Sequence, residues 1–223
     1  MKLVIFDVDG TLIDSQALIL AAMTGAFEAA ALAPPSREAV RAIIGLSLPQ
    51  AMAVLAPDAD PATHARLSEG YRDSFQALRA AGGAEAEVAF YPGALACLGA
   101  LDEAGYLLGV ATGKARRGLD HLLDSHGLRT RFIATQTADD APSKPHPGMV
   151  LNCLALSGVA PGDAVVIGDT EFDMAMARAA GTRALGVGWG YHDRTRLSAG
   201  GAETVVSDYT EVPAAVARLV GAP

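Results

Sequence analysis

Residues 3–11 read LVIFDVDGT, and this stretch determines how the rest of the 223-residue sequence is interpreted. Its first four residues, Leu3–Phe6, are apolar and include β-branched side chains, which predicts a short buried β-strand. The strand ends at Asp7, which begins an acidic turn containing a glycine. A carboxylate at the end of a buried strand is costly to desolvate without a partner, so Asp7 indicates a functional site.

Downstream of about Val88, short apolar runs alternate with helical patterns. Further strands are predicted over Tyr106–Ala111, Phe132–Thr135, Ala164–Ile167, Ala184–Val187 and Val205–Val206. Helices are predicted over Pro92–Ala104, Arg116–Ser125, Pro147–Ser157, Phe172–Ala180 and Val212–Val220. This alternation predicts a parallel sheet with right-handed crossovers, and the unbroken apolar runs indicate that helices cover both of its faces.

The segment between the first strand and this alternating region has a helical character. Ser15 is predicted to cap a helix that continues to about Ala31 and ends before Pro34 and Pro35. From there to about Glu85 the pattern is helical or turn-like, and it contains no convincing strand.

Together these patterns predict an α/β fold with two parts. The first is a doubly wound, Rossmann-like core with a parallel sheet, formed by residues 1–15 and 86–223. The second is a small helical cap formed by residues 16–85, inserted after the first strand. Ser15 and the glycine pair Gly82-Gly83 are the expected hinges between the two parts.

The composition favours a globular protein that binds a small molecule. Hydrophobic residues make up 51% of the chain, which is enough for a substantial core, and the formal net charge is −8. An acidic balance of this size argues against binding to nucleic acid, although a small anionic substrate remains compatible with it. The two cysteines, Cys97 and Cys153, lie in apolar helical patterns and are expected to be reduced and buried.

The N-terminal apolar run reaches Asp7 too soon for a signal peptide, and no apolar run is long enough to span a bilayer. We therefore expect a cytoplasmic protein that does not act at a membrane. The sequence leaves the oligomeric state open.

Chemically reactive side chains follow several of the predicted strands, where open α/β sheets form their sites. The first strand is followed by Asp7 and Asp9, and the later strands are followed by Thr112, Gly113, Lys114, Lys144, Asp169 and Asp173. Only three of the 17 basic residues are lysines, so a lysine at position 144 favours a compact point charge in a crowded site. We predict that these groups converge at one edge of the sheet.

Each of these residues also has an ordinary structural interpretation. Thr112 or Asp169 can cap the following helix, and Asp173 can stabilise the first turn of one. Asp9 with the following glycine can form a simple turn, and Lys144 can be a solvated loop residue. Their joint occurrence at successive strand ends favours the functional interpretation.

Four short motifs resemble those of the haloacid dehalogenase-like hydrolase superfamily, and they occur in that family's order. They are Phe6-Asp7-Val8-Asp9-Gly10-Thr11-Leu12, Thr112-Gly113, Lys144-Pro145-His146-Pro147 and Gly168-Asp169-Thr170-Glu171-Phe172-Asp173. The resemblance covers essentially the whole chain, and the helical segment is similar to the small α-helical cap of that family. The sequence Gly188-Trp189-Gly190-Tyr191-His192 is similar to the phosphoglycolate phosphatase branch.

The resemblance implies a phosphatase with an aspartate nucleophile. Asp7 would attack phosphorus to form an aspartyl-phosphate, while Asp9 would protonate the leaving oxygen and then deprotonate the hydrolytic water. A magnesium ion, Mg²⁺, is the implied cofactor. The side chains of Asp7 and Asp169 and the backbone carbonyl of Asp9 would hold it, with Asp173 in support directly or through water.

The other motif residues would bind the substrate phosphate. Thr112 would donate its hydroxyl and Gly113 its backbone N–H to the phosphoryl oxygens, while Lys144 would pair with both the phosphate and Asp7. Lys114 would either contact the substrate or only flank the start of a helix. A small phosphorylated metabolite is the expected partner, with 2-phosphoglycolate as the leading candidate.

Several further residues are weaker candidates. Arg41 and the turn Gly45-Leu46-Ser47-Leu48 are expected to contribute to specificity from within the cap. His146 is expected to be a hydrogen-bonding loop residue and Trp189 a packing residue. Arg116-Arg117 could hold a substrate carboxylate, although a solvated helix face is the favoured interpretation.

Two other functions remain open. A sugar-phosphate mutase would use the same scaffold, although Gly-Asp-x-x-x-Asp at residues 168–173 lacks the adjacent Glu-Asp pair of related β-phosphoglucomutases. A non-enzymatic phosphate-binding domain would have a degenerate site, whereas all four motifs are intact here. Dehalogenation is disfavoured because Asp9 stands where dehalogenases of the superfamily lack an acid.

Overall fold

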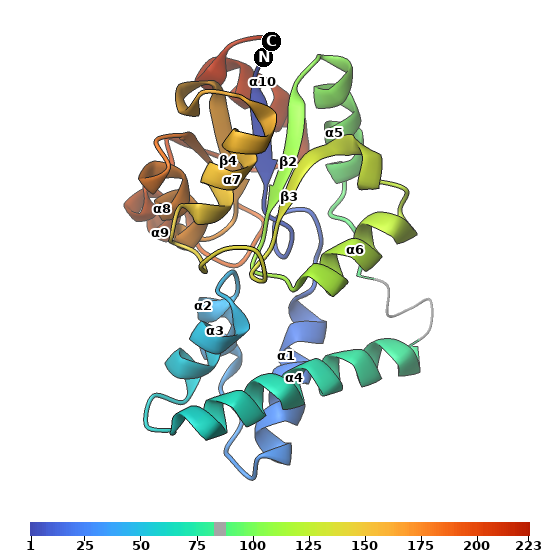
Figure 1. Ribbon diagram of the computed structural model, residues 1–223, viewed down its shortest axis with the longest axis vertical. Helices are drawn as coiled ribbons and strands as arrows, with labels where there is room; N and C mark the ends of the chain where they lie inside the picture. The colour runs from blue at the N-terminus through green and yellow to red at the C-terminus, as the bar shows by residue number, and fades with distance from the viewer. Residues whose placement is uncertain (83–87) are drawn as a thin grey trace.

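The computed structural model describes residues 1–82 and 88–223, and its core contains a six-stranded sheet (Figure 1). The strands are β1 Leu3–Phe6, β2 Leu107–Ala111, β3 Phe132–Gln136, β4 Ala164–Gly168, β5 Arg183–Val187 and β6 Thr204–Val206. Their order across the sheet is β3-β2-β1-β4-β5-β6, and every neighbouring pair is parallel. This arrangement confirms the predicted α/β fold.

Strand β1 lies in the middle of the sheet because it is apolar on both faces. All four of its residues are buried, and alternate side chains enter two different apolar clusters, one on each side of the sheet. Phe6 pairs in register with Val110 of β2 and with Ile167 of β4. The chain therefore leaves β1 at Asp7 beside the carboxyl ends of both neighbouring strands.

Helices cover both faces of the sheet, as the unbroken apolar strands predict. One apolar cluster includes side chains from α5 Ala94–Glu103, α6 Arg116–Ser125 and α10 Val212–Val220. The other includes side chains from α7 Gly148–Ser157, α8 Glu171–Ala179 and α9 Arg194–Gly200. Short 3₁₀ turns occur at Arg129–Arg131, Pro161–Asp163 and Tyr209–Glu211. Cys97 and Cys153 are free and buried, one in each cluster, as expected.

A helical segment follows β1 and forms a separate layer beyond the end of the sheet toward which β1 points (Figure 1). It comprises α1 Gln16–Ala29, α2 Arg37–Ile43, α3 Leu48–Leu55 and α4 Pro61–Gly82. It has its own apolar cluster, which includes Met23, Met52 and Leu67. Gly70 of α4 packs directly against Ala26 of α1, which lets the two helices approach closely. This segment is the inserted helical cap that the sequence predicts.

The limits of the cap stay a prediction. Residue 85, where the cap is expected to end, and Gly83 of the expected hinge lie outside the described residues. None of the helices in the described part of the chain is long and apolar enough to cross a lipid bilayer.

The structure corrects two local predictions. Ser15 occupies the N-cap position of α1 without making a side-chain capping bond, because its hydroxyl donates to Asp9 instead. Helix α9 is absent from the prediction because Leu197 is its only buried residue, so its sequence carries almost no apolar periodicity. Its start is marked instead by Asp193, whose side chain accepts a hydrogen bond from the backbone of Arg196.

Replacing Ile5 by alanine should strongly destabilise the protein, because Ile5 lies fully buried in the middle strand. Truncating a buried isoleucine costs about 2–5 kcal/mol in the free energy of unfolding. The matched control is Ile133→Ala on the edge strand β3, where the side chain is 50% exposed and the loss should be about 0.5 kcal/mol. Urea unfolding measures both values, and equal losses would contradict the central position of β1.

Candidate active site

Residues from separate parts of the sequence meet at the carboxyl edge of the sheet. Asp7 follows β1, Asp169 follows β4, and Asp173 lies in the first turn of α8. Lys144 comes from the loop between β3 and α7. The structure brings these four side chains together in the interior, as the strand ends predict.

Lys144 is enclosed between two carboxylates. Its Nζ lies 2.7 Å from Asp7 Oδ1 and 2.6 Å from Asp173 Oδ1. Its side chain has no exposed surface, so burial opposes its charge. The carboxylates of Asp173 and Asp7 nevertheless raise the pKa of Lys144 above its ordinary value. Lys144 is therefore a fixed, buried cation rather than a solvated loop residue.

Asp7, Asp169 and Asp173 form a compact acidic cluster, whose nearest carboxylate oxygens lie within 4.8 Å of one another. Burial raises the pKa of Asp7 to about 7, although Lys144 opposes this shift. Burial, together with the charges of the other two acids, raises the pKa of Asp169 well above its usual range. When all three acids are ionised, their charge exceeds that of Lys144 by two.

This cluster suits a hard divalent cation such as Mg²⁺, which prefers oxygen ligands. Asp7 Oδ2 is buried and has no hydrogen-bond partner among the described residues. A buried polar atom without a partner is costly, and a cation would satisfy this oxygen while balancing the excess negative charge. The residues present therefore fit the cofactor that the sequence implies.

Asp169 is held from both sides. Its Oδ1 accepts a hydrogen bond of 3.0 Å from the Thr11 hydroxyl, and its Oδ2 accepts one of 2.9 Å from the backbone N–H of Tyr191. Gly10 and Gly190 pack directly against this carboxylate, because a Cβ atom at either position would overlap Asp169. Gly10 also has a φ of 85°, a conformation that favours glycine. The position of Asp169 thus depends on residues that carry no chemistry themselves.

Asp173 has a structural role as well as an electrostatic one. Its Oδ2 accepts hydrogen bonds from the backbone N–H and the hydroxyl of Thr170, at 3.1 and 2.6 Å. The Thr170 side chain in turn accepts from the backbone of Asp173, which completes a capping box at the start of α8. Thr170, and not Asp169, is therefore the N-cap, while Asp173 Oδ1 remains directed at Lys144.

Asp9 lies outside this buried cluster and borders a cavity. Both of its carboxylate oxygens accept hydrogen bonds from Lys114 Nζ, at 2.8 and 2.9 Å. Its Oδ1 also accepts a bond of 2.6 Å from the hydroxyl of Ser15, which lies 3.2 Å from the Tyr191 hydroxyl. The two acids of the first motif therefore have different surroundings, and Lys114 does more than flank a helix.

Thr112 and Gly113 lie where the cap meets the core. Thr112 is buried, and its hydroxyl accepts a hydrogen bond of 3.2 Å from the backbone of Lys114. Thr112 does not cap α6, whose N-cap is Ala115. A Cβ atom at Gly113 would lie only 2.6 Å from the carbonyl oxygen of Gly45, so the cap backbone rests against this glycine.

A cavity of about 1000 Å³ lies between the cap and the core. Asp7, Asp9, Thr112, Gly113 and Lys114 form one part of its wall. The remainder comes mainly from α1, α3, α4 and the loop 44–47 of the cap, and from α6 of the core. Ligand pockets in proteins usually occupy about 300–1,000 Å³, so this one can hold an organic substrate.

The weaker candidates from the cap connect it to the core. Arg41 donates a hydrogen bond of 3.2 Å to the backbone carbonyl of Tyr191, and the N–H of Ser47 donates one of 2.7 Å to the Ser143 hydroxyl. Ser47 also borders the cavity. These contacts fix the cap against the loops that carry the site.

The weaker candidates from the core have mainly structural contacts. His146 accepts a hydrogen bond from the backbone of Gly148, as a loop spacer would. Arg116 forms an ion pair with Asp140, whereas Arg117 borders the cavity. Trp189 packs against aromatic neighbours, as expected, and its indole N–H donates to the backbone of Thr11.

Sequence reasoning missed the residues that position the acids. These residues are Thr11, Ser15, Thr170 and Tyr191. The two threonines stand inside the motifs, next to the acids, so their hydroxyl groups were a usable signal. No spacing rule indicates that the backbone of Tyr191 returns to Asp169, because that contact depends on the path of the loop after β5.

Comparisons with known proteins agree with this geometry. A model of the haloacid dehalogenase-like hydrolases matches residues 4–187. A probable phosphatase, IndB, from Dickeya dadantii is 34% identical over 98% of this chain and 94% of its own length. A phosphoglycolate phosphatase from Rhodospirillum rubrum is 35% identical over 95% and 89%. The crystal structure of a hydrolase from Pseudomonas syringae has a TM-score of 0.86 at 26% identity, covering 98% of this chain and 99% of that one.

Replacing Lys144 by methionine should cost much more stability than removing the partly exposed Lys2. The change leaves Asp7 and Asp173 without their buried counter-charge, and breaking such a pair costs about 3–5 kcal/mol. Lys2→Met is the matched control, because the pair of Lys2 with Asp163 lies at the surface, with side chains 21% and 46% exposed, and its loss should matter much less. Urea unfolding in the presence of a chelator compares the two. Similar midpoints would show that Lys144 is not an essential counter-charge.

Proposed function

The chain belongs to the haloacid dehalogenase-like hydrolases, and on this basis we propose that it is a Mg²⁺-dependent phosphatase acting through an aspartyl-phosphate. The observation that carries this proposal is the position of Asp7. One of its oxygens is held by Lys144, and the other is buried beside two further acids, with no hydrogen-bond partner in the part of the chain that the structure describes. A carboxylate held this way is oriented for attack and is screened from water.

We assign the first chemical step to Asp7 and Asp9. A carboxylate oxygen of Asp7 forms a bond to phosphorus, the bond from phosphorus to the ester oxygen breaks, and a proton from Asp9 goes to that oxygen. In the second step Asp9 takes a proton from water as the water oxygen attacks phosphorus, which releases phosphate and restores Asp7. Both acids border the cavity where the substrate would lie, and Asp7 is the one held by the buried Lys144, which supports this division.

We assign the metal to the side chains of Asp7 and Asp169 and to the backbone carbonyl of Asp9, with Asp173 in support. A bound Mg²⁺ would supply positive charge that reduces the repulsion between the anionic phosphate and the Asp7 carboxylate. The acidic cluster supports the three side-chain assignments, because its oxygens are close together and their charge is not fully balanced.

We assign the binding of the phosphoryl oxygens to four residues, Thr112, Gly113, Lys114 and Lys144. Each borders the cavity or contacts an acid of the first motif. Preorganised donors of this kind each lower a reaction barrier by about 3–4 kcal/mol. The relatives support a small phosphomonoester as substrate, and the phosphoglycolate phosphatase among them keeps 2-phosphoglycolate as a candidate.

The native chain should release phosphate from p-nitrophenyl phosphate only when Mg²⁺ is present. Asp7→Asn should abolish turnover, because an amide is a poor nucleophile and a weak cation ligand. Asp14→Asn is the matched control, since Asp14 is exposed near the same loop and should not affect the rate. A malachite green assay measures the phosphate. Full activity of Asp7→Asn would refute the nucleophile assignment, and turnover in excess EDTA would refute the metal assignment. Interconversion of hexose phosphates without phosphate release would indicate a mutase.

Mg²⁺ should also raise the melting temperature, since a ligand that binds only the folded state stabilises it. At a concentration 100 times its dissociation constant the stabilisation is about 2.7 kcal/mol. Asp169→Asn should remove most of this response by deleting a cluster carboxylate, whereas Asp14→Asn should retain it. Differential scanning fluorimetry with and without Mg²⁺ provides the measurement. An undiminished response in Asp169→Asn would place the ion elsewhere.

A further inference from the structure

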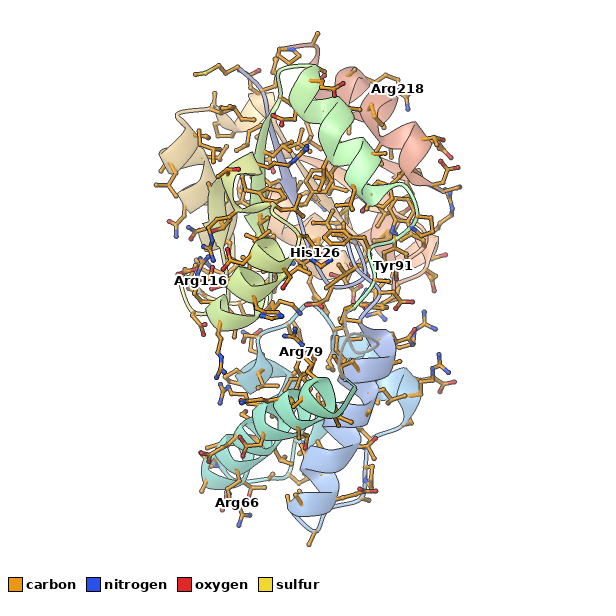
Figure 2. All side chains as sticks on the ribbon, turned by 90° about the vertical axis from the view of Figure 1, so that its right-hand side faces the viewer. Arg66, Arg79, Tyr91, Arg116, His126 and Arg218 are labelled. Carbon is orange, nitrogen blue, oxygen red and sulfur yellow. The ribbon has the colours of Figure 1, made fainter. Side chains whose placement is uncertain are left out.

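The cavity continues well past the candidate phosphate site, between helix α4 of the cap and helix α6 of the core. The α4 wall is formed by Tyr71, Arg72, Phe75, Gln76 and Arg79. Residues spaced by three, four and seven positions share one face of a helix, so this wall is a single face of α4. Figure 2 shows Arg79 on the part of α4 nearest the core, whereas Arg66 lies toward the opposite end of the cap.

The facing wall repeats this spacing. It is formed by Lys114, Arg117, Gly118, His121 and Ser125, and the last four belong to α6. Arg117 and His121 are four residues apart, which corresponds to about 6 Å along a helix axis. One face of α4 and one face of α6 thus enclose the outer part of the cavity.

The charge of these two walls is opposite to that of the whole protein. The chain carries a formal charge of −8, yet the walls present Arg72, Arg79 and Arg117 to the cavity. None of these three forms an ion pair with an acidic side chain in the described ranges 1–82 and 88–223. A concave surface with several cations raises the local concentration of anions.

Two aromatic rings of the α4 wall lie close to the acid of the candidate site, Asp9. The Phe75 ring centroid is 5.8 Å from Lys114 Nζ, and that ammonium is bound to Asp9. Tyr71 packs beside Phe75, with ring centroids 5.8 Å apart. A leaving group that extends from Asp9 along α4 therefore meets two aromatic rings, with Arg72 and Arg79 on the same face.

We propose that the alcohol part of the substrate carries a second anionic group, a carboxylate or a phosphate, separated from the reacting phosphate by an apolar or aromatic spacer. Arg79 and Arg117, from facing walls, bind this second group, and Phe75 with Tyr71 packs against the spacer. The proposal rests on the proposed phosphatase function. It predicts that 2-phosphoglycolate, with a single carbon between its two acidic groups, leaves the aromatic surface unused and is a poorer substrate than a two-anion ester with a longer apolar spacer.

Matched phosphomonoesters test the proposal. We expect kcat/KM to be about 10-fold higher for 4-carboxyphenyl phosphate than for phenyl phosphate. The same ratio is expected for 1,6-hexanediol bisphosphate compared with hexyl phosphate. A 10-fold ratio corresponds to about 1.4 kcal/mol of binding free energy. The two pairs distinguish a carboxylate from a phosphate as the second anion. The preference should appear mainly in KM and should shrink with added salt, because partly exposed charges are screened.

Variants locate the effect. The double substitution Arg79→Gln and Arg117→Gln should bring both kcat/KM ratios close to one. Arg66 is an exposed arginine on the same cap helix, so Arg66→Gln should leave the two ratios unchanged. Circular dichroism melting of all variants shows whether each is folded. Phe75→Ala should reduce kcat/KM for both members of the phenyl pair, since it removes the surface for the spacer.

The possible outcomes separate the two proposals. Three results would overturn the second-anion site and leave the phosphatase function intact. They are kcat/KM ratios near one in the native chain, an equal loss of preference in Arg66→Gln, and a higher kcat/KM for 2-phosphoglycolate than for either two-anion probe. No Mg²⁺-dependent hydrolysis of any phosphomonoester overturns both.

Discussion

The burial of Lys144 between Asp7 and Asp173 is the constraint on which the rest of the structure depends. An ammonium group with no solvent exposure is stable only beside counter-charges, and the buried carboxylates are equally costly without it. These groups come from the first strand, a loop before α7 and the start of α8, so none of them is satisfied until the sheet is assembled. The strand order, with β1 between β2 and β4, is what brings them together.

The two acids of the first motif show how one short turn creates two environments. Asp7 continues the direction of a buried strand and enters the interior, where an ammonium group and two carboxylates surround it. Asp9 lies on the far side of the turn, held by Lys114 and Ser15 next to the cavity. A nucleophile benefits from a fixed, dry position, and a group that exchanges protons with a leaving group benefits from access to it. The geometry of the turn therefore separates two roles that identical side chains could otherwise share.

The sequence predicts the sheet, the inserted cap and the convergence of the acids, because each depends on local patterns and on the general rule that parallel strands end at one edge. Ser15 stands at the predicted N-cap position of α1, but its hydroxyl does not cap the helix, since it donates to Asp9 in the preceding turn instead. The contact of Tyr191 with Asp169 and the position of the α4 arginines across from α6 could not be predicted, because both depend on tertiary packing. Helical periodicity shows that residues share a face, but it does not show which other helix that face opposes.

The glycines around Asp169 affect how this protein can change over evolutionary time. Gly10 and Gly190 have no side chain, and neither position has room for a single additional methyl group. Several exposed residues near the site could vary freely, whereas these two silent positions could accept no other amino acid without displacing an acid. Substitutions should therefore be tolerated least at these two positions that lack a side chain, because any larger residue there would displace the Asp169 carboxylate.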